Sequence, residues 1–508
     1  MTVARTWAAA LSGLDVGIVA VEADLSNQTP GFHIIGLADR AIGEAAQRVR
    51  SACANSGLSL PRRRVTVNLS PASLPKHGAG FDVAVAVAAL ATETPVDRAS
   101  IGSTLHLGEL GLDGRLRPVA GVLPAVHAAA RAGIRRAVVP SGNRHEAALV
   151  DGVDVLGATT LAEVAAWHGA DVEVPAAEPI PAARADDAPA PPPDLADVIG
   201  QREAVDALVV AAAGGHNMLM CGPPGAGKTM LARRLPGLLP DLDDDAALAV
   251  ASVRSLAGAT VTEISRVPPF EAPHHSASVA ALVGGGSRVI RPGAIARASE
   301  GVLFLDEAGE FAAPALDALR QPLETGEIRI DRAGVTATFP ARVQLLLATN
   351  PCPCGNHGIR GSECVCPPAA IRRYLGRLSG PMRDRMDVEL TLTRVTSAHA
   401  GGGTPPISTA RARARVLGAR ERAAERLAAT PFRRNADVPG AWLRDGPYAP
   451  SPVVRRPLDA ALQRGALTLR GYDRVLRIAW SVADLDGASQ LGPHHVGRAL
   501  FLKKGIAS

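Results

Sequence analysis

GPPGAGKT, at residues 222–229, meets every fixed position of the phosphate-loop pattern G-x-x-x-x-G-K-[ST]. NMLMC at 217–221 has the character of a buried strand, and MLARRLPGLL at 230–239 is expected to be the helix that follows. Glycines let such a loop wrap its N–H groups around phosphate oxygens, and the helix N-terminus adds positive potential. Lys228 is expected to reach the β- and γ-phosphates, and the Thr229 hydroxyl to ligate Mg²⁺. We therefore predict an ATP or GTP site formed by Gly222, Pro223, Pro224, Gly225, Ala226, Gly227, Lys228 and Thr229.

A second stretch, GVLFLDE at 301–307, places two acids directly after four apolar residues. Such a run is typical of a buried parallel strand, and ligands bind at the carboxyl ends of these strands. Asp306 is expected to hold Mg²⁺ directly or through water. Glu307 is expected to polarise the attacking water or to position it.

A third apolar run, QLLLATN at 344–350, ends in the amide Asn350. An amide at the end of a neighbouring strand can lie between the acids and the γ-phosphate, where it helps to place the water. The three strands together predict an α/β domain built on a phosphate loop.

Four of the six cysteines follow Asn350 at once, as Cys352-x-Cys354 and Cys364-x-Cys366 in NPCPCGNHGIRGSECVCPP, residues 350–368. No secretory signal is visible at the N-terminus, so we expect the cytoplasm, where thiols stay reduced and disulfides are disfavoured. Two interpretations of the cysteines remain, a zinc site and an ordinary loop. Four thiolates suit tetrahedral zinc, and His357 is a substitute ligand. The C-x-C spacing, which is tighter than the usual C-x₂-C, counts against zinc. Gly355–Glu363 has almost no apolar content to hold it otherwise.

Composition is that of a water-soluble protein, with 47% hydrophobic and 20% charged residues among 508. The longest apolar run, Val83–Ala91, is too short to cross a bilayer, which takes about 20 residues. Seven prolines in residues 175–193 indicate an extended linker. Residues 371–508 carry 24 Lys and Arg against 11 Asp and Glu, a charge balance that suits a polyanion partner or merely a solvated helical surface.

These motifs carry a resemblance to the AAA+ ATPases and, more narrowly, to the YifB/ComM family of magnesium-chelatase-like AAA+ proteins. It extends over essentially the whole chain, through FEAPHHSAS (270–278), GGGSRVIRPGAIARASEGVLFLDE (284–307), LDALRQPLETGEIRI (316–330), ARVQLLLATNPCPCG (341–355), SGPMRDRMDVEL (379–390) and RGYDRVLRIAWSVADLDG (470–487).

The resemblance implies an α/β fold in four parts. A Lon-protease-like α/β domain (ribosomal S5 domain 2-like) would occupy residues 1–172, and a Pro/Ala-rich linker 173–193. An AAA+ core with the Cys-rich insert 350–368 would occupy 194–393, and a basic helical lid 394–508.

The same resemblance implies roles for single residues. Ile199 and Gly200 would pack near adenine. Arg385 would be the finger that reaches a neighbour's ATP, with Arg383 as its rival. Arg470 would be the sensor arginine of the lid, with Arg474 as its rival. A finger acting in trans implies a ring, most simply a hexamer, and for ComM-like proteins the implied activity is DNA branch migration or helicase action in recombination or natural transformation.

ETGEIRIDRAGVTATF at 324–339 alternates as a β-hairpin does. In this clade such a hairpin points into the ring's pore, so Arg329 and Arg332 are candidate DNA contacts, or else ordinary surface arginines. His274 and His275 of the APHH segment are expected to have a structural or loop role, with metal binding by the adjacent pair as the alternative. Glu271 stands where the family usually has a basic residue, which weakens a DNA role for that segment.

A Lon-type peptidase needs a Ser nucleophile beside a Lys base. Along the resemblance, Ala79 stands near the nucleophile position and Leu123 at the base position. Neither side chain can attack a carbonyl or accept its proton, so we predict no peptidase activity. The alternatives to a DNA motor are a magnesium-chelatase-type subunit and a non-motor ATPase that remodels or regulates proteins.

Overall fold

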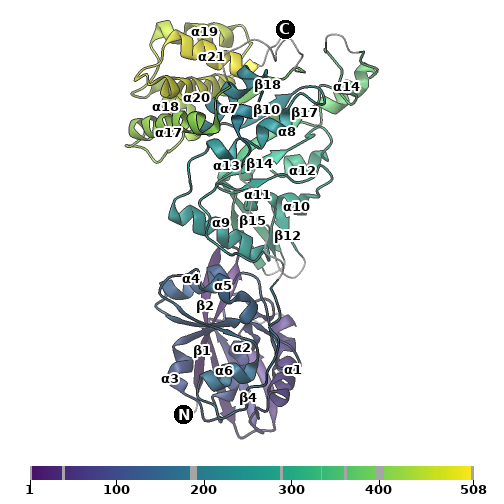
Figure 1. Ribbon diagram of the computed structural model, residues 1–508, viewed down its shortest axis with the longest axis vertical. Helices are drawn as coiled ribbons and strands as arrows, with labels where there is room; N and C mark the ends of the chain where they lie inside the picture. Colours follow the sequence, from purple (N-terminus) through teal and green to yellow (C-terminus); the bar gives the residue numbers. More distant parts are fainter. Residues whose placement is uncertain are drawn as a thin grey trace.

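The computed structural model describes residues 3–36, 40–182, 192–286, 290–332, 335–359, 363–394 and 406–504. Figure 1 shows an N-terminal α/β domain stacked under a second α/β domain, with a helical bundle on the far side of the latter. The α/β class predicted from the sequence is confirmed. No helix among the described residues is long and apolar enough to span a membrane.

The N-terminal domain is built on a seven-stranded mixed sheet in the order β3-β4-β2-β1-β5-β8-β9. In β4 partly and fully buried residues alternate, as expected for a strand with one face on a core. Its strands are β1 (Ala4–Ser12), β2 (Asp15–Ser26), β3 (Gly31–Ile35), β4 (Arg64–Ser70), β5 (Thr104–His106), β8 (Arg136–Pro140) and β9 (Asp154–Ala158), beside a small pair, β6 (Glu109–Leu110) and β7 (Leu116–Arg117).

Helices cover this sheet, and α2 (Asp82–Leu90), the apolar run noted above, is buried along its whole length. The others are α1 (Arg40–Asn55), α3 (Arg98–Gly102), α4 (Val122–Arg131), α5 (Arg144–Ala147) and α6 (Leu161–Trp167). Ala79 lies in a short 3-10 turn before α2, whereas Leu123 is fully buried in α4.

A chain of buried hydrogen bonds crosses this domain through two histidines. His106 Nε2 lies 2.9 Å from His168 Nε2, and the outer nitrogens contact Thr6 Oγ1 at 2.7 Å and Ser100 Oγ at 2.9 Å. Burial is the main cause that lowers both pKa values, to about 4 for His168 and well below the ordinary value for His106. Both rings are therefore neutral in the folded protein at neutral pH.

We expect the N-terminal domain to lose stability between pH 6.5 and about 4. In that window the unfolded histidines bind protons and the folded His168 does not, so the unfolded state gains protons as the pH falls. His168 alone should lower the free energy of unfolding by roughly 3 kcal/mol across this window. Urea unfolding at several pH values measures this change, and a His168→Gln variant should show a flatter pH dependence. An identical slope in the variant would assign the effect to other groups.

The second sheet has five parallel strands in the order β11-β14-β17-β10-β18. They are β10 (Met218–Cys221), β11 (Phe270–Glu271), β14 (Val302–Leu305), β17 (Gln344–Thr349) and β18 (Val388–Thr391). The three strands predicted from apolar runs are thus adjacent, with β17 between β10 and β14. Their carboxyl ends meet at one edge of the sheet.

Short helices and two hairpins surround this sheet. The helices are α7 (Arg202–Gly214), α8 (Lys228–Ala232), α9 (Asp244–Leu256), α10 (Val279–Val283), α11 (Ala294–Arg297), α12 (Ala313–Asp317), α13 (Pro322–Thr325), α14 (Pro368–Leu375) and α15 (Gly380–Arg383); the hairpins are β12 (Gly284–Gly285) with β13 (Arg291–Pro292), and β15 (Glu327–Arg332) with β16 (Val335–Pro340). The expectation of one helix over 230–239 was wrong: α8 ends at Ala232, since Pro236 lacks an N–H and its ring would clash with the carbonyl of Ala232.

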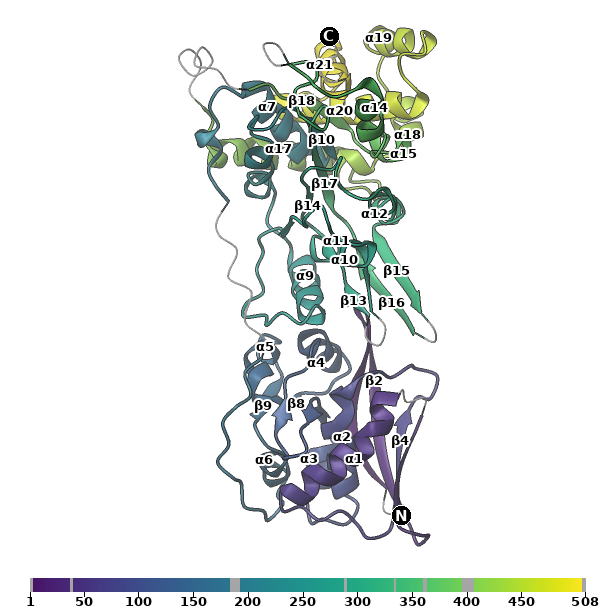
Figure 2. The ribbon, with the colours of Figure 1, turned by 90° about the vertical axis from the view of Figure 1, so that its right-hand side faces the viewer.

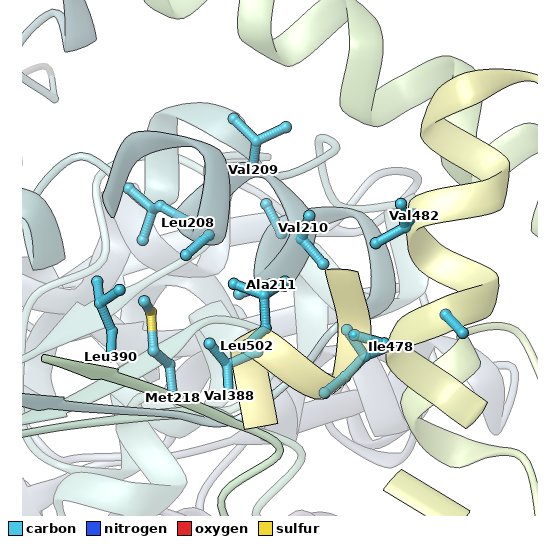
Figure 3. Packing of buried hydrophobic residues seen from close by; sticks show 14 of the residues in the cluster. Leu208, Val209, Val210, Ala211, Met218, Val388, Leu390, Ile478, Val482 and Leu502 are labelled. Carbon is cyan, nitrogen blue, oxygen red and sulfur yellow. The ribbon is translucent and has the colours of Figure 1, made fainter. Parts of the chain in front are cut away.

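The C-terminal helices share one apolar core with the five-stranded sheet. Figure 3 shows Ile478, Val482 and Leu502 facing residues of α7, β10 and β18. The helices are α17 (Thr409–Arg426), α18 (Gly440–Asp445), α19 (Pro452–Gln463), α20 (Leu469–Asp486) and α21 (Pro493–Lys504). This shared core fixes where the helical bundle sits on its own subunit.

The N-terminal domain docks on the β15–β16 hairpin through the turn between β1 and β2 (Figure 2). Leu14 donates its N–H to the Thr338 carbonyl at 3.2 Å. Gly13 has φ +75°, and a Cβ there would lie 2.0 Å from the same oxygen, so only glycine fits. A second contact joins Gly121 N–H to the Ser255 carbonyl at 3.1 Å, where α4 meets α9.

Candidate ATPase active site

The phosphate loop connects β10 to α8 at the carboxyl edge of the five-stranded sheet. Gly225 and Gly227 have φ +78° and +85°, the left-handed conformations that turn successive N–H groups into one concavity. A Cβ on Gly222 would lie 2.7 Å from the Leu392 carbonyl. Glycine at these positions thus permits both the loop's shape and its packing.

Lys228 is buried under this loop, and its Nζ donates to the carbonyls of Gly222 at 2.6 Å and Pro223 at 3.1 Å. It also donates to Asn350 Oδ1 at 2.9 Å. Burial lowers the pKa of Lys228, which nearby carboxylates partly offset. The structure therefore brings together the two side chains predicted to meet the γ-phosphate, from β17 and from α8.

Thr229 and Asp306 face each other, as a shared magnesium ligand set requires. Thr229 Oγ1 donates to Asp306 Oδ2 at 2.5 Å, and the other oxygen of Asp306 accepts the N–H of Glu307 at 2.9 Å. A hydroxyl and a carboxylate are hard oxygen donors that suit Mg²⁺, whose shell is completed by phosphate and water. These residues fit the ion, and Thr229 and Asp306 would be its protein ligands.

Glu307 stands beyond the end of β14 with φ +51°, a conformation that non-glycine residues seldom adopt. Its carboxylate is about half exposed, and Oε2 lies 3.1 Å from His275 Nδ1. His275 was expected to have only a structural or loop role, and its contact with Glu307 was missed, because APHH carries no strand pattern that would place it at this edge. In this arrangement the His275 imidazole contacts the Glu307 carboxylate oxygen that would otherwise be available to a water molecule.

Two further residues were expected near adenine. Ile199 is 58% exposed and Gly200 has φ +72°, so both lie in an open turn before α7. Gln201, the next residue of the same VIGQ segment (198–201), is buried and donates to the carbonyls of Ala226 at 3.3 Å and Thr393 at 2.8 Å. It ties the turn to the phosphate loop.

Three of the predicted arginines, Arg385, Arg470 and Arg474, lie at the opposite end of the strands. Asn217 precedes β10 and donates to the Arg385 carbonyl at 3.2 Å, whereas Gly222 follows β10. Five residues of strand separate these positions by about 16 Å. Arg385, Arg470 and Arg474 line one cavity of about 920 Å³ at this end. None of the three is near the phosphate loop of its own subunit.

This cavity, between the sheet and the C-terminal helices, is rich in charge. Eight arginines line it with five carboxylates: Arg342, Arg385, Arg420, Arg433, Arg434, Arg470, Arg474 and Arg477, with Glu300, Glu324, Asp387, Asp437 and Asp473. The excess of guanidinium groups makes it suited to an anion with several charges.

The two candidate finger residues, Arg383 and Arg385, differ in their ion pairs and hydrogen bonds. Arg383 forms an ion pair with Glu389 at 3.2 Å, away from the cavity. Arg385 donates to the Arg320 carbonyl at 3.2 Å and to the Pro381 carbonyl at 2.7 Å, and it pairs with exposed Glu324. Burial is the main cause that lowers the pKa of Arg385.

On the side of the C-terminal helices, Arg474 donates to Asp387 Oδ1 at 2.8 Å, whereas the exposed side chain of Arg470 has no hydrogen bond or ion pair with another described residue. Asp387 is buried, which by itself raises its pKa, but His216 and the arginines Arg474 and Arg477 outweigh burial and hold that pKa at about 2. Arg474 is therefore anchored to a permanent anion of its own subunit, and Arg470 is free to meet a ligand.

The four cysteines lie together beside the phosphate loop. Sγ of Cys352 is 3.4 Å from that of Cys354, and both are 3.7 Å from Cys364; Cys366 completes a set within 4.8 Å. A Cβ on Gly355 would lie 2.5 Å from Pro224 Cδ, so the insert packs on the loop itself. His357 approaches through its backbone N–H, 3.3 Å from Cys352 Sγ.

The β15–β16 hairpin is antiparallel in the described residues, with Arg329 opposite Thr338. Ile328 and Ile330 face the protein, whereas Arg329 and Arg332 are exposed. Arg329 pairs loosely with Asp331 at 3.2 Å. Its guanidinium is accessible to a polyanion.

Comparison with known proteins agrees with this architecture. Family models match residues 194–400 (Magnesium chelatase, subunit ChlI), 21–143 (Subunit ChlI of Mg-chelatase) and 406–503 (Magnesium chelatase, subunit ChlI C-terminal). The chain is 48% identical over 506 residues to an uncharacterized protein of Mycobacterium tuberculosis, covering 99% of each.

It is also 40% identical over 513 residues to the competence protein ComM of Haemophilus influenzae, covering 98% of this chain and 97% of ComM. Identity to the YifB protein of Escherichia coli is 38% over 495 residues, covering 96% and 94%. Near-complete coverage at this identity, with an AAA+ phosphate-loop fold, makes this chain a member of the YifB/ComM family of magnesium-chelatase-like AAA+ ATPases.

Proposed function

We propose that this protein is a ring-forming ATPase, built as a hexamer, that couples ATP hydrolysis to movement on single-stranded or branched DNA, as in branch migration or unwinding during recombination or natural transformation. The observation that carries the proposal is the short connection between the hairpin and the nucleotide site. β16 ends at Pro340 and β17 begins at Gln344, and β17 leads to Asn350, which contacts Lys228. A shift of β17 with nucleotide state therefore moves the hairpin that bears Arg329 and Arg332.

In the proposed reaction, the loop N–H groups and Lys228 hold the phosphates, while Thr229 and Asp306 hold Mg²⁺. Glu307 leaves His275 and polarises the attacking water, which Asn350 helps to place. The cavity that holds Arg385 and Arg470 faces the γ-phosphate of a neighbouring copy, because those side chains are about a strand's length from their own phosphate loop. This geometry supports a ring, in which each site is completed by the next subunit.

DNA is expected to stimulate ATP hydrolysis through the hairpin. Phosphate release is measured with and without single-stranded or forked DNA, with Glu307→Gln protein as the control for contaminating ATPases. The ratio of stimulated to basal turnover should fall about tenfold or more in an Arg329→Ala/Arg332→Ala variant, because phosphate contacts are lost. Arg131→Ala/Arg135→Ala, two exposed arginines on the N-terminal domain, is the matched control. If DNA neither binds nor changes turnover, a chelatase-type or protein-remodelling ATPase becomes the better assignment.

We also propose that Cys352, Cys354, Cys364 and Cys366 bind a structural zinc ion. In a tetrahedral thiolate site with bonds of about 2.3 Å the sulfurs are about 3.8 Å apart, close to the 3.4–3.7 Å between Cys352, Cys354 and Cys364. The zinc would fix the insert on Pro224 and take no part in hydrolysis. We retain Lon-like residues 1–172 as a docking domain without peptidase activity, because Ala79 and Leu123 offer no dyad.

Purified protein is expected to contain about one zinc per chain, the content of a closed four-cysteine site. A Cys364→Ser/Cys366→Ser variant should lose the metal and become sensitive to proteolysis between residues 350 and 368, because the insert has little apolar content to hold it. Cys53→Ala, a buried cysteine of the N-terminal domain, should keep the metal. Metal-free native protein would refute the site.

A further inference from the structure

A hollow of about 680 Å³ opens at the end of the N-terminal domain that is remote from the ATPase. It lies between the C-terminal half of α1, the start of edge strand β3 and the loop that leads into β4. Buried Cys53, Leu58 and Val65 form its floor, and the partly buried Phe32 forms one wall. It is therefore a recess with an apolar floor at the edge of the domain's core.

Guanidinium groups surround this recess. Arg50, Arg62 and Arg63 line it and are exposed, and no acidic side chain is among its described lining residues. On the rim, Arg63 pairs with Glu93 at 2.9 Å. Both partners are about half exposed, and such a surface pair contributes little and exchanges readily with another anion.

An apolar recess with an aromatic wall and a cationic rim matches the chemistry of single-stranded nucleic acid. Arg50 lies over the Phe32 ring, 5.9 Å from its centroid, so a π-face and a cation occur together. Bases stack on aromatic faces irrespective of sequence, while phosphates bind guanidinium groups. An acidic peptide would satisfy the rim but leave the apolar recess empty, and a duplex presents no unstacked base.

We propose that this hollow, defined by Phe32, Arg50, Arg62 and Arg63, is a second binding site for single-stranded DNA, separate from the β15–β16 hairpin. The inference rests on the proposed action on DNA. β2 runs from Asp15, beside the hairpin contact, to Ser26, which pairs with Arg64 next to the hollow. Eleven residues of strand set the two sites about 36 Å apart. The N-terminal domain then binds a DNA strand after the ATPase domain has unwound it from its complement.

The test is binding of fluorescein-labelled oligo-dT of thirty residues to the full chain by anisotropy, over a series of salt concentrations. Arg62→Glu/Arg63→Glu should weaken binding about tenfold or more and lower the salt slope by about 1.4, since each single-strand phosphate contact contributes about 0.7. Arg131→Glu/Arg135→Glu carries the same charge change at another surface of the domain and should bind within about twofold of the unmodified protein.

A second variant separates stacking from charge. Phe32→Leu keeps an apolar side chain at this half-buried position but removes the π-face, and should weaken oligo-dT binding about fivefold or more. An unlabelled acidic peptide, oligo-glutamate, should not compete at equal charge concentration.

The outcomes distinguish failure of the proposed action on DNA from failure of the proposed DNA site in the hollow. If the unmodified chain binds no oligonucleotide, the proposed action on DNA fails. If it binds, but the Arg62/Arg63 and Phe32 variants match the Arg131/Arg135 control, the hollow is not a DNA site. If oligo-glutamate displaces the oligonucleotide from the hollow, the site is one for acidic peptides and the proposal is overturned.

Discussion

Replacing Glu307 with glutamine is expected to reduce ATP hydrolysis by about 10²–10⁴-fold while leaving ATP binding intact. The glutamine is isosteric but cannot accept a proton or polarise water as a carboxylate does. Phosphate and magnesium contacts belong to Lys228, Thr229 and Asp306, and these residues are unchanged. Binding is measured with a fluorescent ATP analogue and turnover by phosphate release.

Glu310→Gln is the matched control for this experiment. Glu310 is an exposed acid three residues further on, and it pairs with Arg377 at 3.0 Å rather than facing the phosphate loop. Its variant should hydrolyse ATP at close to the normal rate. A Glu307→Gln protein that keeps more than about a tenth of the turnover would remove Glu307 from the reaction.

Arg385→Ala is expected to abolish turnover, by about 10³-fold or more, as loss of an arginine finger does. Because Arg385 lies at the opposite end of β10 from its own phosphate loop, the defect should be complemented between subunits. Mixing inactive Arg385→Ala with inactive Glu307→Gln protein should restore activity. In an equimolar random ring about a quarter of the interfaces combine an intact Glu307 with a neighbour's intact Arg385.

Arg383→Ala provides the contrast, since its ion pair with Glu389 points away from the cavity. That variant should keep most of its activity. Mixed rings that stay inactive at every ratio would mean that Arg385 acts within its own subunit or only supports the fold. Exchange of subunits is confirmed beforehand with differently tagged chains.

The phosphate-loop edge could be predicted from sequence because its signals are local. β14 and β17 are short apolar runs followed at once by the polar residue that acts, and β10 leads directly into the phosphate loop, so identifying each strand also places the groups at its end. The contact between Lys228 and Asn350 then follows from parallel neighbours ending at one edge.

What the sequence could not provide depends on contacts between distant segments. His275 reaches Glu307 from an irregular loop, and nothing in APHH indicates that partner. The insert after Asn350 packs on Pro224, which motif spacing alone does not reveal. The fit of Gly13 against Thr338 is a backbone contact between two domains that leaves no pattern in either segment.

That last contact has a mechanical consequence. The β15–β16 hairpin is not a free finger, because the turn between β1 and β2 is hydrogen-bonded to its second strand. Any stroke of the hairpin must carry the N-terminal domain with it or first break that joint. In the proposed motor cycle, the work done at the hairpin is therefore divided between moving the DNA and moving the N-terminal domain.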